Sequence, residues 1–268
     1  MGDDANLCPV LFIPHGGGPL PLLGDAGHQQ LVDFLQSIPA RIRTPAAICV
    51  ISAHWEESIA TITGNALPSL IYDYYGFPDR AYAIQYPAPG SPNLARKIFA
   101  ALQQSGIPAH LGEQRGYDHG LFVPLKLMFQ DAGIPCMQLS LLSNLDPAAH
   151  IAIGKALRPL RRDNVLFIGS GFSFHNMKAF FTGNHGMDEQ NNAFQEWLID
   201  ICTNPKLSFA DRSSLLIAWE RAPAAHYCHP REEHLLPLHV CVGLSNEAAE
   251  LVFDGEVLGK KACGLIWR

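Results

Sequence analysis

Three of the chain's twelve histidines follow short apolar runs that are typical of buried strands. They are His15 after residues 10–13, His54 after residues 47–52 and His175 beyond residues 165–168. Ligands in an open α/β sheet bind in the crevice beyond the carboxyl ends of the strands, so imidazoles placed there can converge. Imidazole is a common metal ligand and a proton carrier near neutral pH. The pattern therefore predicts one site for metal binding or acid–base chemistry.

Two further histidines are candidates for the same site. His119 lies in the turn Gly-Tyr-Asp-His-Gly, just before a helical pattern over residues 121–131. His234 lies in Glu-Glu-His-Leu-Leu-Pro, near the start of a helix, because Pro237 fits only within a first helical turn. Both are expected at the ends of elements, where side chains can reach a crevice.

Other motif-based chemistries fit the residues less well. His229, His234 and His239 are five residues apart, a spacing that would spread them around a helix, unlike the paired ligands of a zinc finger. Residues 169–173 lack the spacing of a nucleophilic serine elbow. The run Gly16-Gly17-Gly18 lacks the lysine and the spacing of a phosphate-binding loop.

The elements that must position these histidines alternate between strand and helix. Strands are predicted over residues 10–13, 47–52, 59–63, 136–142 and 165–168, and helices over residues 29–37, 93–104, 121–131, 146–160 and 187–202. This order predicts a single α/β domain over residues 1–268, with a mostly parallel, mixed central sheet flanked by helices on both faces. Short apolar pieces at residues 251–253, 256–258 and 264–267 are expected to be edge strands.

Composition excludes several classes of protein. The chain has 268 residues, 48% of them hydrophobic, and a net charge of −6, which fits a globular domain without a basic surface for nucleic acid or acidic membranes. Its apolar runs are too short to span a bilayer, and its first residues, Met-Gly-Asp-Asp, lack the basic start of a secretory signal. Seven scattered cysteines without a C-x-x-C pair indicate reduced thiols. We expect a cytoplasmic protein.

The sequence resembles the class III extradiol ring-cleavage dioxygenases, specifically the 4,5-DOPA extradiol dioxygenase family, which is related to the catalytic subunit of protocatechuate 4,5-dioxygenase. Seven motifs occur in order along the whole chain: Pro14-His15-Gly16, Ser52-Ala53-His54-Trp55, Tyr75-Gly76-Phe77-Pro78, Tyr86-Pro87-Ala88-Pro89-Gly90-Ser91-Pro92, Asp118-His119-Gly120, His175-Asn176 and Glu233-His234-Leu235-Leu236-Pro237-Leu238. Each motif is weak alone, and the ordered set is specific.

The resemblance implies roles for the histidines. His15 and His54 would be metal ligands, and the third ligand would come from the Glu233-His234 segment. Family members resembling this chain favour His234, whereas the wider class uses two histidines and one carboxylate, a role open to Glu233. His175 matches the catalytic acid–base histidine and, in zinc-bound relatives, a further metal contact. His119 would be catalytic beside the substrate.

Three further residues are expected on the substrate side. Asp118 is next to His119 in sequence, and the pair is expected to hydrogen-bond the substrate or bound oxygen. Tyr75 and Tyr86 belong to an aromatic stretch that would either wall an aromatic pocket or pack in the core. The run Gly16-Gly17-Gly18-Pro19 departs from the Gly-Ser-Pro turn of many relatives, which leaves the identity of the substrate open.

The resemblance also implies a reaction and its partners. An oxidoreductase of this kind would cleave a DOPA-like catechol next to the diol with O2, giving a semialdehyde. It would use Fe(II) for activity, with Zn as the alternative bound metal and no organic cofactor. The substrate would be a small aromatic diol, with no nucleic acid or membrane partner, in a monomer or homodimer. Two alternatives stay open: a zinc-dependent hydrolase using the same histidines, and a non-catalytic binding protein on this fold.

Overall fold

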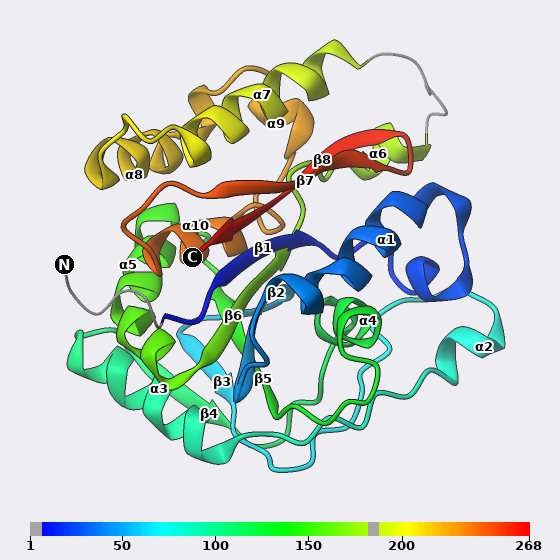
Figure 1. Cartoon of the computed structure of the whole chain (residues 1–268), viewed down its shortest axis with the longest axis vertical. Helices are drawn as coiled ribbons and strands as arrows, with labels where there is room; N and C mark the ends of the chain where they lie inside the picture. Colours follow the sequence, from blue (N-terminus) through cyan, green and yellow to red (C-terminus); the bar gives the residue numbers. More distant parts are fainter. Residues whose placement is uncertain (1–6, 182–187) are drawn as a thin grey trace.

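The computed structural model describes residues 7–181 and 188–268, and these residues form one mixed sheet. Its strand order is β4-β3-β5-β2-β6-β1-β8-β7 (Figure 1). The strands are β1 (Val10–Pro14), β2 (Ala47–Glu57), β3 (Ala60–Thr63), β4 (Ala109–Gly112), β5 (Cys136–Leu142), β6 (Val165–Gly171), β7 (Glu250–Val257) and β8 (Lys260–Trp267). The four central strands β5, β2, β6 and β1 are parallel, whereas β3–β5, β1–β8 and β7–β8 pair antiparallel. The predicted α/β fold is confirmed.

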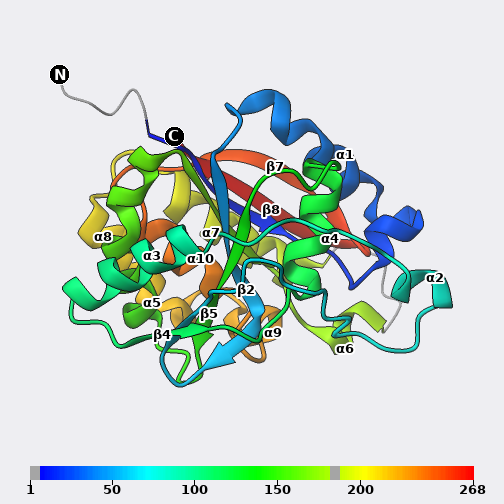
Figure 2. The ribbon, with the colours of Figure 1, turned by 90° about the horizontal axis from the view of Figure 1, so that it is seen from below.

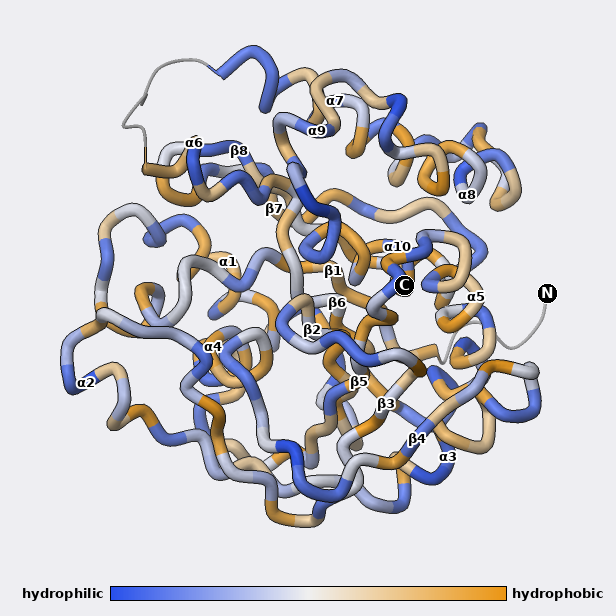
Figure 3. Tube along the Cα trace, turned by 180° about the vertical axis from the view of Figure 1, so that it is seen from behind, coloured by the Kyte–Doolittle hydropathy of each residue, from blue (hydrophilic) through white to orange (hydrophobic). Residues whose placement is uncertain are grey.

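Helices cover both faces of this sheet (Figures 1 and 2). They are α1 (Gln29–Ser37), α2 (Asp79–Tyr82), α3 (Pro92–Gln104), α4 (His119–Met128), α5 (Pro147–Leu157), α6 (Met177–Phe181), α7 (Glu189–Thr203), α8 (Phe209–Ile217), α9 (Ala225–Cys228) and α10 (Leu236–Gly243). Side chains of a strand alternate between faces. Leu11 and Ile13 therefore pack in the core with α1 and α4, while Val10 and Phe12 pack in the core with α3, α5 and α10. Figure 3 shows apolar residues gathered along the central strands.

The structure differs from the sequence-based elements at a few places. β4 was not predicted, because it has only four residues and none of them is fully buried. The C-terminal pieces form one antiparallel hairpin, in which only β7 is at the edge, because β8 inserts beside β1. Leu258 and Gly259 make its turn with positive φ. Two predictions involve residues outside the described ones. Met187 was the first residue of the helix predicted over residues 187–202, and the first four residues of the chain were part of the argument for a cytoplasmic protein.

Two further expectations concern the whole chain. All seven cysteines are buried and unbridged, as reduced thiols require. Within residues 7–181 and 188–268, no helix is long and apolar enough to cross a membrane.

The carboxyl ends of β1, β2 and β6 meet at one edge of the sheet. Pro14 and Gly171, the last residues of β1 and β6, pair with each other, and Ser52 of β2 pairs with Ser170 at the same level. β2 itself continues through His54 to Glu57, with a register shift in its pairing to β5 between Ile51 and Glu56. The next backbone amide, that of His15, donates to the carbonyl of Gly171 at 3.3 Å. This register brings residues that are far apart in sequence to one place.

Candidate metal and catalytic site

Five histidines from five segments line one cavity of about 980 Å³ at this edge of the sheet. His15 follows β1, His54 lies near the end of β2, His119 begins α4, His175 follows β6 and His234 precedes α10. All five were candidates from the sequence, and the structure brings all five together.

Two of these imidazoles touch through the nitrogens that ligate metals. Nε2 of His15 lies 3.0 Å from Nε2 of His54, and with His119 they offer nitrogens that all lie within 4.8 Å of one another. Bonds from zinc to imidazole are about 2.0–2.1 Å long, so two ligands at roughly a right angle have nitrogens about 3 Å apart. The His15–His54 pair fits one metal ion bound between them.

Hydrogen bonds behind His15 determine which of its nitrogens carries the proton. Nδ1 of His15 lies 3.0 Å from Oγ of Ser170, and that hydroxyl donates its only proton to the carbonyl of Gly120 at 2.5 Å. The hydroxyl must therefore accept from Nδ1–H of His15. The lone pair of His15 is then on Nε2, the nitrogen next to His54, as metal binding requires.

Asp73 lies behind two of the histidines, His119 and His54. Its Oδ1 accepts from both the backbone amide of His119 at 3.0 Å and Nδ1 of His119 at 2.9 Å, while its Oδ2 lies 3.9 Å from Nδ1 of His54. Burial raises the pKa of Asp73, but hydrogen bonding and charge from His119 outweigh it and leave the pKa below its ordinary value. An ionised Asp73 therefore accepts from Nδ1–H of His119, which leaves Nε2 as the nitrogen outside this hydrogen bond.

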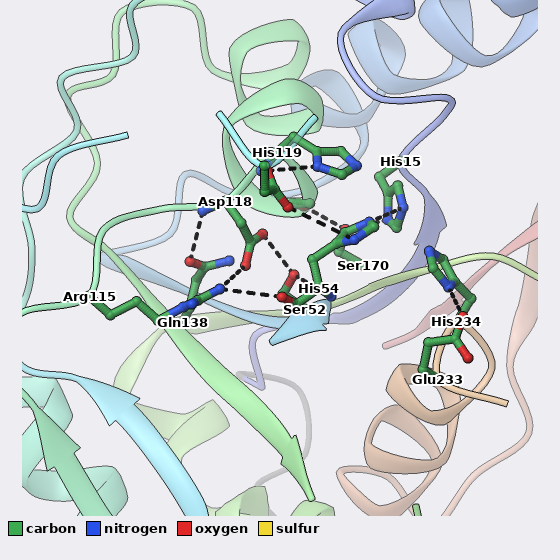
Figure 4. Close-up of polar contacts among 12 residues, drawn as sticks. His15, Ser52, His54, Arg115, Asp118, His119, Gln138, Ser170, Glu233 and His234 are labelled. Atoms are coloured by element: carbon green, nitrogen blue, oxygen red, sulfur yellow. Dashed lines mark hydrogen bonds and ion pairs between the residues drawn. The ribbon is translucent and has the colours of Figure 1, made fainter. Parts of the chain in front are cut away.

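Glu233 does the same for the two remaining histidines. Its Oε1 lies 2.8 Å from Nδ1 of His234 and 3.2 Å from Nδ1 of His175, whose rings stack with centroids 3.4 Å apart. Burial raises the pKa of Glu233, but the bond and charge from His175 and the charge of Arg231 leave it below its ordinary value. Glu233 is absent from the described lining of the cavity, whereas both histidines line it. Figure 4 shows the contact between Glu233 and His234.

Arg231 fixes Glu233 from behind and ties this segment to β2. Its two terminal nitrogens donate to the two oxygens of Glu56 at 2.6 and 2.7 Å, and Nη1 also lies 3.3 Å from Oε2 of Glu233. Two-point pairing of this kind sets geometry as well as charge. The ion pair therefore holds the segment of His234 in register with the strand of His54.

Burial keeps the central imidazoles neutral. It holds the pKa values of His15, His54 and His234 well below the ordinary histidine value, and neighbouring imidazoles lower each of them further. A neutral imidazole is the form that binds metal. The donor set is therefore ready for a metal ion at neutral pH.

Small residues let these segments approach closely. A Cβ on Gly171 would lie 2.2 Å from the carbonyl oxygen of His234, which accepts the backbone amide of Phe172 at 2.8 Å. A Cβ on Gly120 would lie 2.6 Å from Oγ of Ser52. The sequence reasoning overlooked these glycines, together with Asp73 and Ser170. The Gly169-Ser170-Gly171 triplet directly after the predicted strand over residues 165–168 was the signal for close backbone packing, and in the structure it forms the end of β6.

Two residues expected on the substrate side lie elsewhere. Tyr86 is 2% exposed, and its hydroxyl donates to the carbonyl of Phe129 in the core. Asp118 is fully buried, accepts from Ser52 and pairs with Arg115 (Figure 4). Neither is among the described residues that line the cavity, since sequence neighbours at a helix start point in different directions.

The third expected residue, Tyr75, does line the cavity and is 92% exposed, at its mouth. The rejected zinc finger is also absent from the described part of the chain: the Nε2 atoms of His229 and His239 lie against the backbone carbonyls of Ser173 and Leu216.

Removing the charge of Glu233 tests its role in orienting His234. We expect Glu233→Gln to weaken metal binding by about 10- to 100-fold, the usual effect of losing a partner behind a ligand. A chelator competition with Zn(II) measures the dissociation constant. Glu232→Gln is the matched control, because no side-chain partner is found for Glu232 among the described residues. Equal affinity in the two variants would contradict the role.

Comparisons with known proteins agree with this geometry. Residues 9–262 match the family model described as the catalytic LigB subunit of aromatic ring-opening dioxygenase. A dioxygenase named tasH from Hapsidospora irregularis is 38% identical, over 98% of this chain and 86% of its own length. A 4,5-DOPA dioxygenase extradiol from Beta vulgaris is 37% identical over 96% of each chain.

A solved structure has the same fold. The crystal structure of an uncharacterized protein from Escherichia coli K12 superposes with a TM-score of 0.80 at 27% identity, over 97% of this chain and all of the other. The motif order, the histidine cavity and the match along nearly the whole chain lead to one assignment: the chain belongs to the LigB family of aromatic ring-opening dioxygenases.

Proposed function

We propose that this protein is an extradiol dioxygenase that opens the ring of a DOPA-like catechol next to its diol and releases a semialdehyde. The observation that supports this most strongly is the set of buried histidines whose Nδ1 atoms are held from behind, leaving Nε2 for a metal inside a largely apolar cavity. Both atoms of O2 end in the product, so the reaction requires no reducing cofactor. The names of the relatives from Beta vulgaris, Mirabilis jalapa and Portulaca grandiflora support the DOPA-like substrate.

We assign the metal to His15, His54 and His234. His119 competes for the third position, because its nitrogen is the one grouped with those of His15 and His54, while the His234 ring lies 4.9 Å from that of His54. A carboxylate lies behind either ring, Asp73 behind His119 and Glu233 behind His234, so the preference for His234 rests on the resemblance to family members that carry a ligating histidine there. When bound here, Fe(II) would supply open coordination positions for the diol and O2 and the electrons that activate O2.

The remaining histidines would handle protons. His175 has its Nδ1 held by Glu233 and lines the cavity, so its other nitrogen is available to take a catechol proton and return it to a leaving oxygen. His119, held by Asp73, would accept a hydrogen bond from the second hydroxyl. The apolar walls would exclude water from the reacting groups.

The test is O2 consumption with L-DOPA and simple catechols after the metal has been removed anaerobically. Samples reconstituted with Fe(II) and with Zn(II) run in parallel. Uptake with Fe(II) alone, with a new visible absorbance band, supports ring cleavage. No uptake with any catechol, despite one bound metal per chain, would overturn the proposal in favour of the zinc hydrolase.

His175 should matter for turnover more than for binding. We expect His175→Ala to lower kcat by about 10²- to 10⁴-fold, the usual range for a general acid–base, with a much smaller change in catechol affinity. Steady-state rates with Fe(II) and catechol titrations of the Zn(II) form separate the two effects. The exposed His226→Ala is the matched control. Metal loss in His175→Ala would instead identify His175 as a ligand.

A further inference from the structure

The charged side chains in the described wall of the cavity, apart from the histidines, are all acidic, whereas a site that binds an acidic molecule usually offers basic side chains. Apart from the five histidines, its described lining contains two charged side chains, the carboxylates Asp25 and Asp73. The described lining holds no arginine or lysine, and residues 182–187 contain neither in sequence. Away from the histidines and the metal they would bind, an anionic group inside the described part of the cavity would meet carboxylates and no arginine or lysine.

The cations nearest in sequence to the lining are engaged or turned away. Lys260 follows the lining residue Gly259, but its side chain is 5% exposed and its ammonium binds Asp188 at 2.6 Å. Lys178 follows the lining residue Met177, and it is exposed outside the described lining.

Two backbone donors at the wall are also occupied. The amide of Gly17 donates to Nε2 of His28 at 2.9 Å, and the amide of His119 donates to Asp73 at 3.0 Å. A carboxylate on the substituent, away from the metal, would lose its hydration without gaining an arginine, a lysine or either of these two amides, which is costly. The described wall therefore disfavours an anion electrostatically and through desolvation.

The rest of the wall is apolar and large. Beyond the histidines it is formed by residues such as Tyr74, Phe77, Phe172, Phe180 and Leu258. Cavities of about 300–1,000 Å³ hold ligands of drug size, so a volume of about 980 Å³ leaves room beyond a single benzenediol ring. The shape and chemistry fit an apolar group attached to that ring.

We propose that the substrate is a catechol with a bulky apolar substituent and without a carboxylate, the diol lying at the histidines and the substituent among the aromatic side chains. This rests on the proposed function and makes its substrate class specific. The proposed substrate therefore differs from L-DOPA itself, which carries a carboxylate.

Two catechols of matched length test the proposal: 4-propylcatechol and 3-(3,4-dihydroxyphenyl)propanoate, which differ by a terminal carboxylate. Their dissociation constants are measured on the Zn(II) form by calorimetry, and their kcat/KM values on the Fe(II) form. We expect 4-propylcatechol to bind at least about 10-fold more tightly, because only its substituent transfers into the apolar wall without losing a charge's hydration. Equal or tighter binding of the propanoate would overturn the proposal.

A variant places a cation where the wall lacks one. Met177 lines the cavity and is 51% exposed, so Met177→Arg can be accommodated without burying a charge. We expect it to shift the affinity ratio toward the propanoate by at least about 5-fold, while the uncharged Met177→Gln control leaves the preference for 4-propylcatechol in place. An unchanged ratio in Met177→Arg would count against a substituent lying along this wall.

The two proposals fail in different ways. If the Zn(II) form discriminates between the two catechols but the Fe(II) form cleaves neither, the proposed ring cleavage is wrong. The proposed binding of an apolar substituent among the aromatic side chains, here called the apolar subsite, then stands. If both are cleaved with equal kcat/KM and bind equally, ring cleavage stands and the apolar subsite is wrong. Absence of binding by either catechol would overturn the apolar subsite.

Discussion

Replacing His15 or His54 with alanine is expected to abolish tight metal binding. Their Nε2 atoms lie 3.0 Å apart, so each variant removes one of two nitrogen ligands that can bind the same metal ion. Loss of a partner behind a ligand costs about 10- to 100-fold in metal affinity, and loss of the ligand itself should exceed that range. Metal content after dialysis and chelator competition with Zn(II) measure the effect.

A graded control separates ligation from packing. Ser170→Ala keeps both imidazoles and removes only the hydroxyl that holds Nδ1 of His15, so it should weaken metal binding less than either alanine variant. Thermal unfolding of the metal-free proteins shows whether a variant still folds. Unchanged metal affinity in both His15→Ala and His54→Ala would show that the metal site lies elsewhere.

Adding one methyl group at Gly171 is expected to damage the site and the fold together. A Cβ there would lie 2.2 Å from the carbonyl oxygen of His234, so the strand and the segment before α10 must separate. Overpacking of this kind costs about 1–3 kcal/mol of the free energy of unfolding. Since the displaced segment carries His234, metal affinity should also fall by at least about 10-fold. Urea unfolding with and without Zn(II) measures both losses.

Gly133→Ala is the matched control for this substitution. A Cβ at Gly133 would meet no atom within 4 Å, and its backbone is not in the left-handed region. It should therefore leave stability and metal affinity close to those of the unmodified protein. If Gly171→Ala behaved like Gly133→Ala, the close packing of β6 against the His234 segment would not determine the geometry of the site.

The positions of the site histidines could be predicted from the sequence because they follow local rules. Apolar runs ending in His15, His54 and His175 predict buried parallel strands, and such strands bring their carboxyl ends together. Pro237 placed His234 at a helix start for an equally local reason, and α10 does begin at Leu236.

The parts that could not be predicted depend on long-range packing. Asp73 lies in an irregular segment, and nothing near it in sequence indicates that its carboxylate reaches His119. Asp118 was misplaced for the opposite reason: adjacency to His119 suggested a shared role, but its extended backbone at the start of α4 turns the side chain into the core. The insertion of β8 beside β1 likewise depends on pairing across the whole chain.

The strand order also determines when a newly made chain can bind metal. β1 carries His15 at its end, but it pairs with β6 and β8, where Val10 faces Phe167 and Trp267. During synthesis, β1 emerges before both of its neighbours, β6 and β8, so His15 cannot be fixed by this pairing until β8 has left the ribosome. Pairing between such distant segments also slows folding. Metal loading therefore follows the synthesis of β8 and its pairing with β1.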